Sequence, residues 1–504
     1  MSPDPSNGVE RHVGLVRGTR DWLQADCARM SGYERSLTAS FARAGYRPVR
    51  TPILELADLH ERKSGAGIVG KLFEVSGAGT AGICLRPELT AGLARAYVEA
   101  AEPPPLPWRA AVSGPVFRFQ EPGEAVVREF VQAGVELIGA GGPAADAEVI
   151  WLADWSLRAL GVAAPKVRIG HVGLILELLD AAGLPPSANS ALIESLSEAA
   201  SEGKGVKTLE AALDRLTEWL GTAGADAAAA FAPAAAAADP GVDRLFRHLV
   251  PDVAGRRSGG EIVGRLRAKW ALEHSLSDAL ENVRGIVAAL SALRGPAREV
   301  LARLEREFAA RAPGTVAALA ELCDMLDRLG VDLGRVELDL GFGRGIGFYT
   351  QMIFELSVDT SEGAVEVCGG GRYDGLARVL GGRDRDDRGA GFAFGLERLD
   401  RALAATAPTV EKPSRGWLVT GDPRRAATLA TFLRDRVDLP VVVAEMEIAP
   451  AVAHAKSLGL DRIVTIAAEV EVWDLEHGDV RAVRGDELVA QIKGRLALAG
   501  GDAR

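Results

Sequence analysis

Two segments of the chain combine carboxylates with other polar groups in ways suited to holding a cationic ligand. In the first, LRPELT (residues 85–90), a short apolar strand pattern runs into Arg-Pro and then into Glu88 and Thr90. Glu88 can accept hydrogen bonds from an ammonium group, and the Thr90 hydroxyl can donate or accept beside it. The same residues also fit the cap of a helix N-terminus, with Pro87 near the first turn. Both interpretations stay open at this point.

The second segment is a predicted β-hairpin formed by FRFQ (residues 117–120) and REFVQAGVE (residues 128–136). Gln132 and Glu136 lie four residues apart on one strand, so their side chains share a face and form an acceptor-rich floor. Arg118 can grip a phosphate oxygen with two N–H groups. An ordinary sheet face with salt bridges is the alternative.

Three glycine-rich segments each carry one arginine. GRGIGFYT (residues 343–350) predicts close backbone approach to a ligand, with Arg344 able to stabilise a developing negative charge. CGGGRYDGL (residues 368–376) predicts a loop against a planar or polar ligand. GFAFGLERL (residues 391–399) predicts a strand running into a helix, with Arg398 placed to meet a phosphate. Taken singly, a bulge, a surface turn and a helix with one exposed arginine are the alternative explanations for the three segments.

Composition excludes several classes of protein. The 504 residues are 48% hydrophobic and 25% charged, which predicts a globular chain of two to four domains. We expect no transmembrane segment and no secretory signal, because the sequence lacks a long apolar run and an apolar N-terminal region. We expect no metal site built from His or Cys, because the four cysteines and seven histidines are scattered. This pattern fits the cytoplasm. The net charge of −11 argues against broad non-specific nucleic-acid binding.

The elements that must position these groups follow from hydrophobic periodicity. Helices are expected at Asp26–Gly45 and Thr90–Glu102, and strands at Tyr46–Leu56, Ala110–Phe119 and Val131–Ile138. The chain divides into six predicted parts: a polar arm at 1–16, an alternating helix and strand region at 17–180, a helical insertion at 181–330, a second strand-rich region at 331–407, a linker at 408–415, and an α/β unit at 416–504.

Taken in order, the motifs resemble those of the histidyl-tRNA synthetase family of class II aminoacyl-tRNA synthetases. FRFQ…REFVQAGVELIG is similar to class II motif 2, GFAFGLERL to motif 3, and RGIGFYTQMIFE and GGGRYDGL to the two histidine-specific motifs. The resemblance implies an α+β fold, with a six-stranded antiparallel class II core, a helical insertion and a C-terminal α/β anticodon-binding-like domain. It also implies a homodimer, with the helix at Asp26–Gly45 near the two-fold axis.

The resemblance further implies an activity and a set of site residues. The activity is that of a histidine–tRNA ligase, which activates L-histidine with ATP and Mg²⁺ to histidyl-adenylate and transfers it to tRNA(His). Arg344 and Arg118 would be catalytic, and Arg118, Gln120 and Arg398 would bind ATP. The residues implied for histidine binding are Glu88, Thr90, Gln132, Glu136, Tyr349 and Tyr373.

The sequence departs from the family pattern at several ATP-side positions. Gly347 and Phe348 replace an Asp and a Tyr, Val126 replaces an Arg, and Gln120 stands where Glu is usual. A non-catalytic relative, the regulatory subunit of ATP phosphoribosyltransferase, keeps the core and binds histidine. Its partner would be the catalytic subunit of that transferase. The departures favour the relative, and Arg344 with the C-terminal domain favours the ligase.

Overall fold

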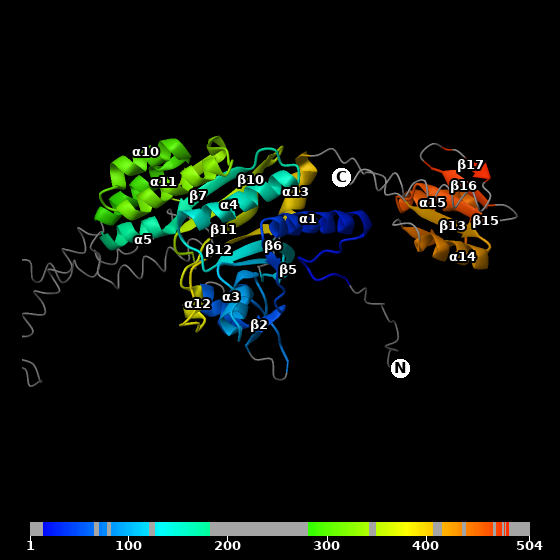
Figure 1. Ribbon diagram of the computed structural model, residues 1–504, viewed down its shortest axis with the longest axis horizontal. Coiled ribbons are helices and arrows are strands. Elements are labelled where there is room, and N and C mark those ends of the chain that lie inside the picture. Colours follow the sequence, from blue (N-terminus) through cyan, green and yellow to red (C-terminus); the bar gives the residue numbers. More distant parts are fainter. Residues whose placement is uncertain are drawn as a thin grey trace, which may run out of the picture. The chain divides into compact units, whose positions relative to one another are not determined.

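A nine-stranded sheet forms the centre of the first of two units, residues 1–406 (Figure 1). Its strands are β1 (Arg47–Pro48), β5 (Trp108–Phe117), β6 (Glu129–Ile138), β7 (Lys166–His171), β8 (Arg294–Pro296), β9 (Val336–Asp339), β10 (Met352–Thr360), β11 (Gly363–Arg372) and β12 (Gly389–Gly395). The strand order is β1-β5-β6-β12-β11-β10-β7-β9-β8. The six strands from β5 to β7 pair antiparallel throughout, whereas β1 and β9 attach to them in parallel. The predicted six-stranded antiparallel core is therefore confirmed.

This computed structural model describes residues 14–64, 70–77, 82–119, 127–181, 281–341, 349–406, 416–435, 440–466, 470–475, 478 and 480–482. The first 13 residues of the predicted arm, most of the predicted insertion (182–280) and the predicted linker lie outside this set.

Helices cover both faces of the large sheet. They are α1 (Gln24–Arg43), α2 (Ala57–Ser64), α3 (Thr90–Glu99), α4 (Gly142–Ala159), α5 (Val172–Ala181), α10 (Ala297–Phe308), α11 (Pro313–Arg328), α12 (Leu376–Val379) and α13 (Leu396–Thr406). A small antiparallel sheet, β2 (Leu54–Leu56), β4 (Ile83–Leu85) and β3 (Phe73–Glu74), lies beside α2 and α3.

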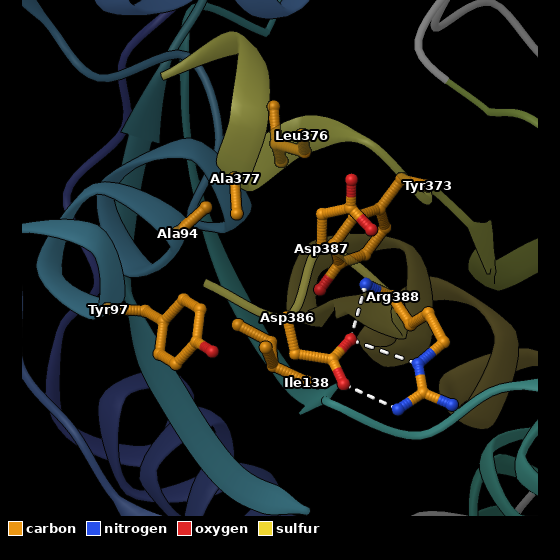
Figure 2. Close-up of a pocket in the computed structure, with 9 residues that line it drawn as sticks. All are labelled: Ala94, Tyr97, Ile138, Tyr373, Leu376, Ala377, Asp386, Asp387 and Arg388. Carbon is orange, nitrogen blue, oxygen red and sulfur yellow. Dashed lines mark hydrogen bonds and ion pairs between the residues drawn. The ribbon is translucent and has the colours of Figure 1, made fainter. Parts of the chain in front are cut away.

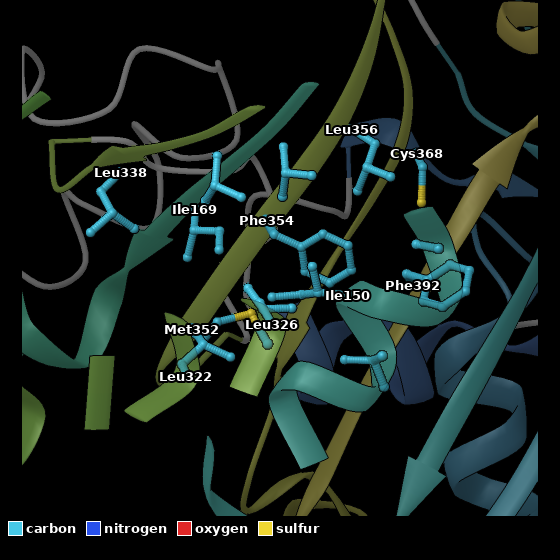
Figure 3. Close-up of a cluster of buried hydrophobic side chains, with 14 of the residues drawn as sticks. Ile150, Ile169, Leu322, Leu326, Leu338, Met352, Phe354, Leu356, Cys368 and Phe392 are labelled. Carbon is cyan, nitrogen blue, oxygen red and sulfur yellow. The ribbon is translucent and has the colours of Figure 1, made fainter. Parts of the chain in front are cut away.

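Side-chain alternation along the hairpin β5–β6 separates the two faces. Ala111, Val135 and Leu137 belong to the large core that includes residues of α1, α4, α11 and α13. Figure 3 shows part of this core, where Ile150 of α4 and Leu326 of α11 lie near the sheet. The alternate residues of the hairpin, among them Ala110 and Ile138, pack instead with α3. Gln132 and Glu136 have the parity of Ile138, so they face α3.

The described end of the predicted insertion, residues 281–330, joins this same core. Residues 281–292 are helical, and buried side chains of that helix, α10 and α11 belong to one cluster with the sheet. The strand predicted at Tyr46–Leu56 is wrong as a single element. It divides into β1 and β2, which join different sheets, and Pro52 lies between them.

The second unit, residues 407–504, carries a five-stranded sheet. Its elements are β13 (Trp417–Gly421), α14 (Pro423–Arg434), β14 (Val441–Val443), α15 (Ile448–Ser457), β15 (Arg462–Ile466), β16 (Val470–Asp474) and β17 (Val480–Ala482). The order is β14-β13-β15-β16-β17, with the first three strands parallel and the last two antiparallel. Among the described residues, no helix is both long enough and apolar enough to cross a membrane.

Candidate active site

A buried carboxylate on β6 is the centre of the site. One oxygen of Glu136 accepts a hydrogen bond from the Thr90 hydroxyl at 2.5 Å, and the other accepts one from the Tyr373 hydroxyl. Glu136 is only 3% exposed and Tyr373 only 4%. Thr90 begins α3 and Tyr373 directly follows β11, so three distant segments meet here. The structure thus brings together three of the predicted histidine-binding residues.

Glycines on β11 and β12 give these side chains room. Gly391 pairs with Glu136 across β6 and β12, and a Cβ at Gly391 would collide with the Glu136 carboxylate and the Val135 carbonyl. A Cβ at Gly389 would likewise collide with the Tyr373 ring. The prediction of a loop at residues 368–376 is therefore wrong for its first half. Residues 368–372 form a strand. Glycine is needed at 370 and 371 because a Cβ there would collide with atoms of the neighbouring strands and with the Tyr349 ring.

Tyr373 is fixed by its neighbour Arg372, which points to the opposite face. Arg372 is fully buried and donates from Nε to Asp146 of α4 at 2.7 Å and from Nη1 to Asp374 at 3.0 Å. Asp374 in turn accepts from the Gly389 amide at 3.0 Å. These hydrogen bonds hold the turn after β11 in place, so the Tyr373 side chain is oriented with its hydroxyl toward Glu136.

Glu88 has the predicted role of a helix cap, and its carboxylate also binds a cationic side chain of the protein itself. Its carboxylate accepts the backbone N–H groups of Thr90 at 2.7 Å and Ala91 at 3.0 Å, which satisfies two free donors of the first turn of α3. It also forms an ion pair with Lys63, whose Nζ lies 2.8 Å from Oε2, and it lies 3.6 Å from His60 Nδ1. Glu88 is therefore both a helix cap and a member of a buried charged cluster.

Lys63 and His60 were not predicted as site residues. They lie three positions apart on one face of α2, and both are buried. One signal was available in the sequence: only nine of the 58 basic residues are lysines, so a lysine in this arginine-rich chain stands out.

The charges of the cluster are strongly coupled. Burial raises the pKa of Glu136 to about 7, although the Thr90 and Tyr373 hydroxyls and the Lys63 charge oppose the rise. Burial alone would also raise the pKa of Glu88, but the Lys63 ammonium and His60 hold it well below its usual value. Burial lowers the pKa of Lys63 despite its acidic neighbours. Two carboxyl groups in one site thus have opposite shifts.

The remaining predicted residues of the hairpin face lie close by. Arg118 follows β5, donates from Nε to the Pro87 carbonyl at 3.1 Å, and its charge contributes to lowering the pKa of Lys63. Gln132 is half-buried on the α3 face of β6, four residues before Glu136. The Tyr349 ring packs with Tyr373 and lies over Gly371, where an added Cβ would be 2.8 Å from it.

Arg398 lies beside Gly395, which pairs with Gln132 across β12 and β6. It projects from α13, its side chain is 56% exposed, and it forms an ion pair with Glu366 at 3.3 Å. Gln120 and Arg344 lie outside the described residues, as do Val126, Gly347 and Phe348. The ATP side of the predicted site is therefore described only through Arg118 and Arg398.

A small pocket with room for about one water molecule, partly open to solvent, adjoins the Tyr373 ring (Figure 2). Tyr97 of α3, Ile138 of β6 and Leu376 of α12 supply apolar walls, and the ion pair between Asp386 and Arg388 forms another wall. Glu136 is not part of its lining. The pocket thus lies against the Tyr373 ring and does not include the Glu136 carboxylate. Within the described ranges, no group of three or more His, Cys, Asp or Glu side chains is placed to hold a metal ion.

Comparison with known proteins agrees with this architecture. The sequence profile described as histidyl-tRNA synthetase matches residues 18–250 and 239–399. A histidine–tRNA ligase of Methanosarcina acetivorans is 29% identical, with 96% of this chain and 99% of that protein aligned. An ATP phosphoribosyltransferase regulatory subunit of Moorella thermoacetica is 31% identical, over 81% of this chain and 86% of that protein.

A solved histidyl-tRNA synthetase from Nostoc shares the fold. Its TM-score is 0.65 at 18% identity, and the match covers 96% of this chain and all of the other. The profile match, the two relatives and the antiparallel core together show that this chain belongs to the histidyl-tRNA synthetase family.

Proposed function

We propose that the chain is a histidine–tRNA ligase, which converts L-histidine and ATP to histidyl-adenylate with release of pyrophosphate, and then transfers the histidyl group to tRNA(His) with release of AMP. The observation that carries this proposal is the alignment with a histidine–tRNA ligase over 96% of the chain, which includes the C-terminal unit. The buried cluster of Glu88, Thr90, Glu136 and Tyr373 supports it from the side of chemistry.

In this proposal the acidic cluster recognises the amino acid. Glu88 receives the ligand ammonium, with Thr90 and Gln132 beside it, and Glu136 with Tyr373 faces the imidazole N–H groups. The pKa of Glu136, about 7, leaves this carboxyl able to accept or donate toward either ring nitrogen. Tyr349 and Tyr373 supply the flat walls against which an imidazole can pack.

The activation step needs charge stabilisation rather than a base, because the histidine carboxylate that attacks the α-phosphate is already ionised. Arg118 and Arg398 hold the ATP phosphates, Gln120 meets the adenine, and Arg344 stabilises the charge that develops on the α-phosphate. Mg²⁺ bound to ATP would neutralise charge on the pyrophosphate leaving group.

A second candidate is a histidine-binding regulatory subunit of ATP phosphoribosyltransferase. The relative of that name from Moorella thermoacetica has 31% identity, against 29% for the Methanosarcina acetivorans ligase, and the departures at Val126, Gly347 and Phe348 fall on the ATP side. In that case the partner is the catalytic subunit of the transferase in place of tRNA(His).

We also propose a cytoplasmic homodimer. Exposed apolar side chains at Ile53, Leu54 and Leu56, on and beside β2, support a second copy as the partner of this surface. Light scattering of the purified chain at micromolar concentration should give twice the monomer mass, and a monomer would contradict this part of the proposal.

Charging of a tRNA(His) transcript with labelled histidine tests the main proposal. We expect histidyl-tRNA to accumulate only when ATP and Mg²⁺ are present. Absence of charging, together with histidine binding measured by calorimetry, would contradict the ligase and favour the regulatory subunit.

A further inference from the structure

The ammonium group of Lys63 already forms an ion pair with the Glu88 carboxylate. Lys63 lies on α2, its side chain is fully buried, and its Nζ is 2.8 Å from Oε2 of Glu88. This is the carboxylate that the proposed function assigns to the ammonium of the amino acid. The chain's own side chain therefore lies where the ligand is expected to bind.

The contacts of Glu88 leave little room for a second cation. Oε2 meets the Thr90 N–H and Lys63, and Oε1 meets the Ala91 N–H and, at a longer 3.6 Å, His60 Nδ1. A carboxylate offers about four acceptor sites, so a ligand ammonium that forms a close ion pair with Glu88 must replace one of these partners. The two backbone donors belong to the first turn of α3, which leaves the side chains of Lys63 and His60 as partners that can move. Of these two, Lys63 makes the much shorter contact, at 2.8 Å against 3.6 Å, and is the one that presents an ammonium group.

Electrostatics argues in the same direction. Lys63 shares its surroundings with the positive charge of Arg118, and burial already disfavours its charged form. Bringing a second ammonium to Glu88 adds a like charge at short range in a site closed to water. Lys63 and a ligand ammonium are therefore competitors for one carboxylate.

We propose that Lys63 is a specificity-determining residue: its ammonium occupies the ammonium subsite at Glu88, and an amino-acid ligand must displace it in order to bind. The proposal rests on the proposed function, because it uses the assignment of this cluster to histidine. It states that the α-amino group of histidine adds little to affinity in the natural protein, since one ion pair is lost for each one formed.

Calorimetry with two ligands and a variant tests this inference. The ligands are L-histidine and imidazolepropionate, which is histidine without its amino group. The variant is Lys63→Met, and the matched control is Lys166→Met, since Lys166 is half-exposed on β7 and pairs with Asp359 away from the site. In the natural protein we expect the two ligands to bind within roughly tenfold of each other.

In Lys63→Met, histidine binding should tighten by roughly 10- to 100-fold, the usual worth of a hydrogen bond to a charged group, whereas imidazolepropionate binding should change little. Lys166→Met should change neither. Equal tightening for both ligands would mean that the variant only loosens the pocket, and weaker histidine binding would mean that Lys63 helps the ligand; either result overturns the inference.

Two further measurements keep the inference falsifiable if Lys63→Met does not fold. Lys63→Gln retains a neutral donor to Glu88 and should tighten histidine binding by a smaller factor. The natural protein alone is also decisive, because a preference for histidine over imidazolepropionate of more than 100-fold would overturn competition at Glu88. If the natural protein binds neither ligand at millimolar concentration, the proposed function fails first, which is a different outcome from normal binding without competition.

Discussion

The substitution Glu136→Gln should make the protein more stable at alkaline pH, even though it damages the site. Burial raises the pKa of Glu136 from 4.5 to about 7, with the Thr90 and Tyr373 hydroxyls and Lys63 opposing the rise and Glu88 adding to it. Between these two pH values the folded protein keeps a proton that the unfolded chain has released. Stability must therefore fall as pH rises through this window.

The size of the effect follows from the same two values. The difference between pKa values of 4.5 and about 7 corresponds to roughly 3 kcal/mol of the free energy of unfolding. This stability is fully lost above pH 7 and fully kept below pH 4.5. Gln resembles the protonated carboxyl in shape and in having one donor group and one acceptor, so the variant avoids this cost. We expect similar melting temperatures for both proteins near pH 5 and a variant that melts several degrees higher at pH 8.

Infrared difference spectra give the direct assay. The natural protein minus Glu136→Gln should show the C=O band of a protonated carboxyl at pH 6, and this band should vanish by about pH 8.5. A band that titrates near the ordinary glutamate value, or a variant that is less stable than the natural protein at pH 8, would refute the reasoning.

Three further substitutions test other parts of the site. Tyr373→Phe removes one donor to Glu136 and should weaken histidine binding by about 5- to 30-fold in calorimetry; unchanged affinity would contradict the role assigned to the Tyr373 hydroxyl. Gly391→Ala places a Cβ on the Glu136 carboxylate and should weaken binding by roughly 100-fold or more, whereas Gly32→Ala, with nothing within 4 Å, should have no effect; equal behaviour of the two alanines would argue against the packing. Arg344→Ala should slow adenylation about 100- to 1000-fold in single-turnover kinetics with a smaller change in histidine affinity; a loss confined to affinity would contradict its role.

The sequence predicted the centre of the site because its residues lie on elements with clear patterns. Glu136 stands on a strand with regular alternation, and Thr90 begins a helix right after a short apolar strand, so their faces could be worked out from spacing. The short apolar strand expected just before Arg86 is present as β4, Ile83–Leu85. Tyr373 was predicted by motif resemblance, and its contact with Glu136 came from the structure.

Other features depend on tertiary contacts that spacing does not encode. Asp146 and Arg372 form a buried pair although 226 residues separate them. Lys63 meets Glu88 only because α2 packs on α3. Glycine is rare in strands, so the run before Arg372 favoured a loop, and the collision that requires glycine there is visible only once β11 and β12 are paired.

Histidine-dependent ATP–pyrophosphate exchange is the most direct test of the central claim, that this acidic cluster serves a histidine-activating enzyme. Millimolar ATP suits the assay, because Val126 replaces an arginine expected to bind ATP. We predict exchange that requires L-histidine and that Arg344→Ala lowers about 100-fold or more. No exchange above background, while calorimetry shows that histidine binds, would contradict the ligase and leave the regulatory subunit as the function of this chain.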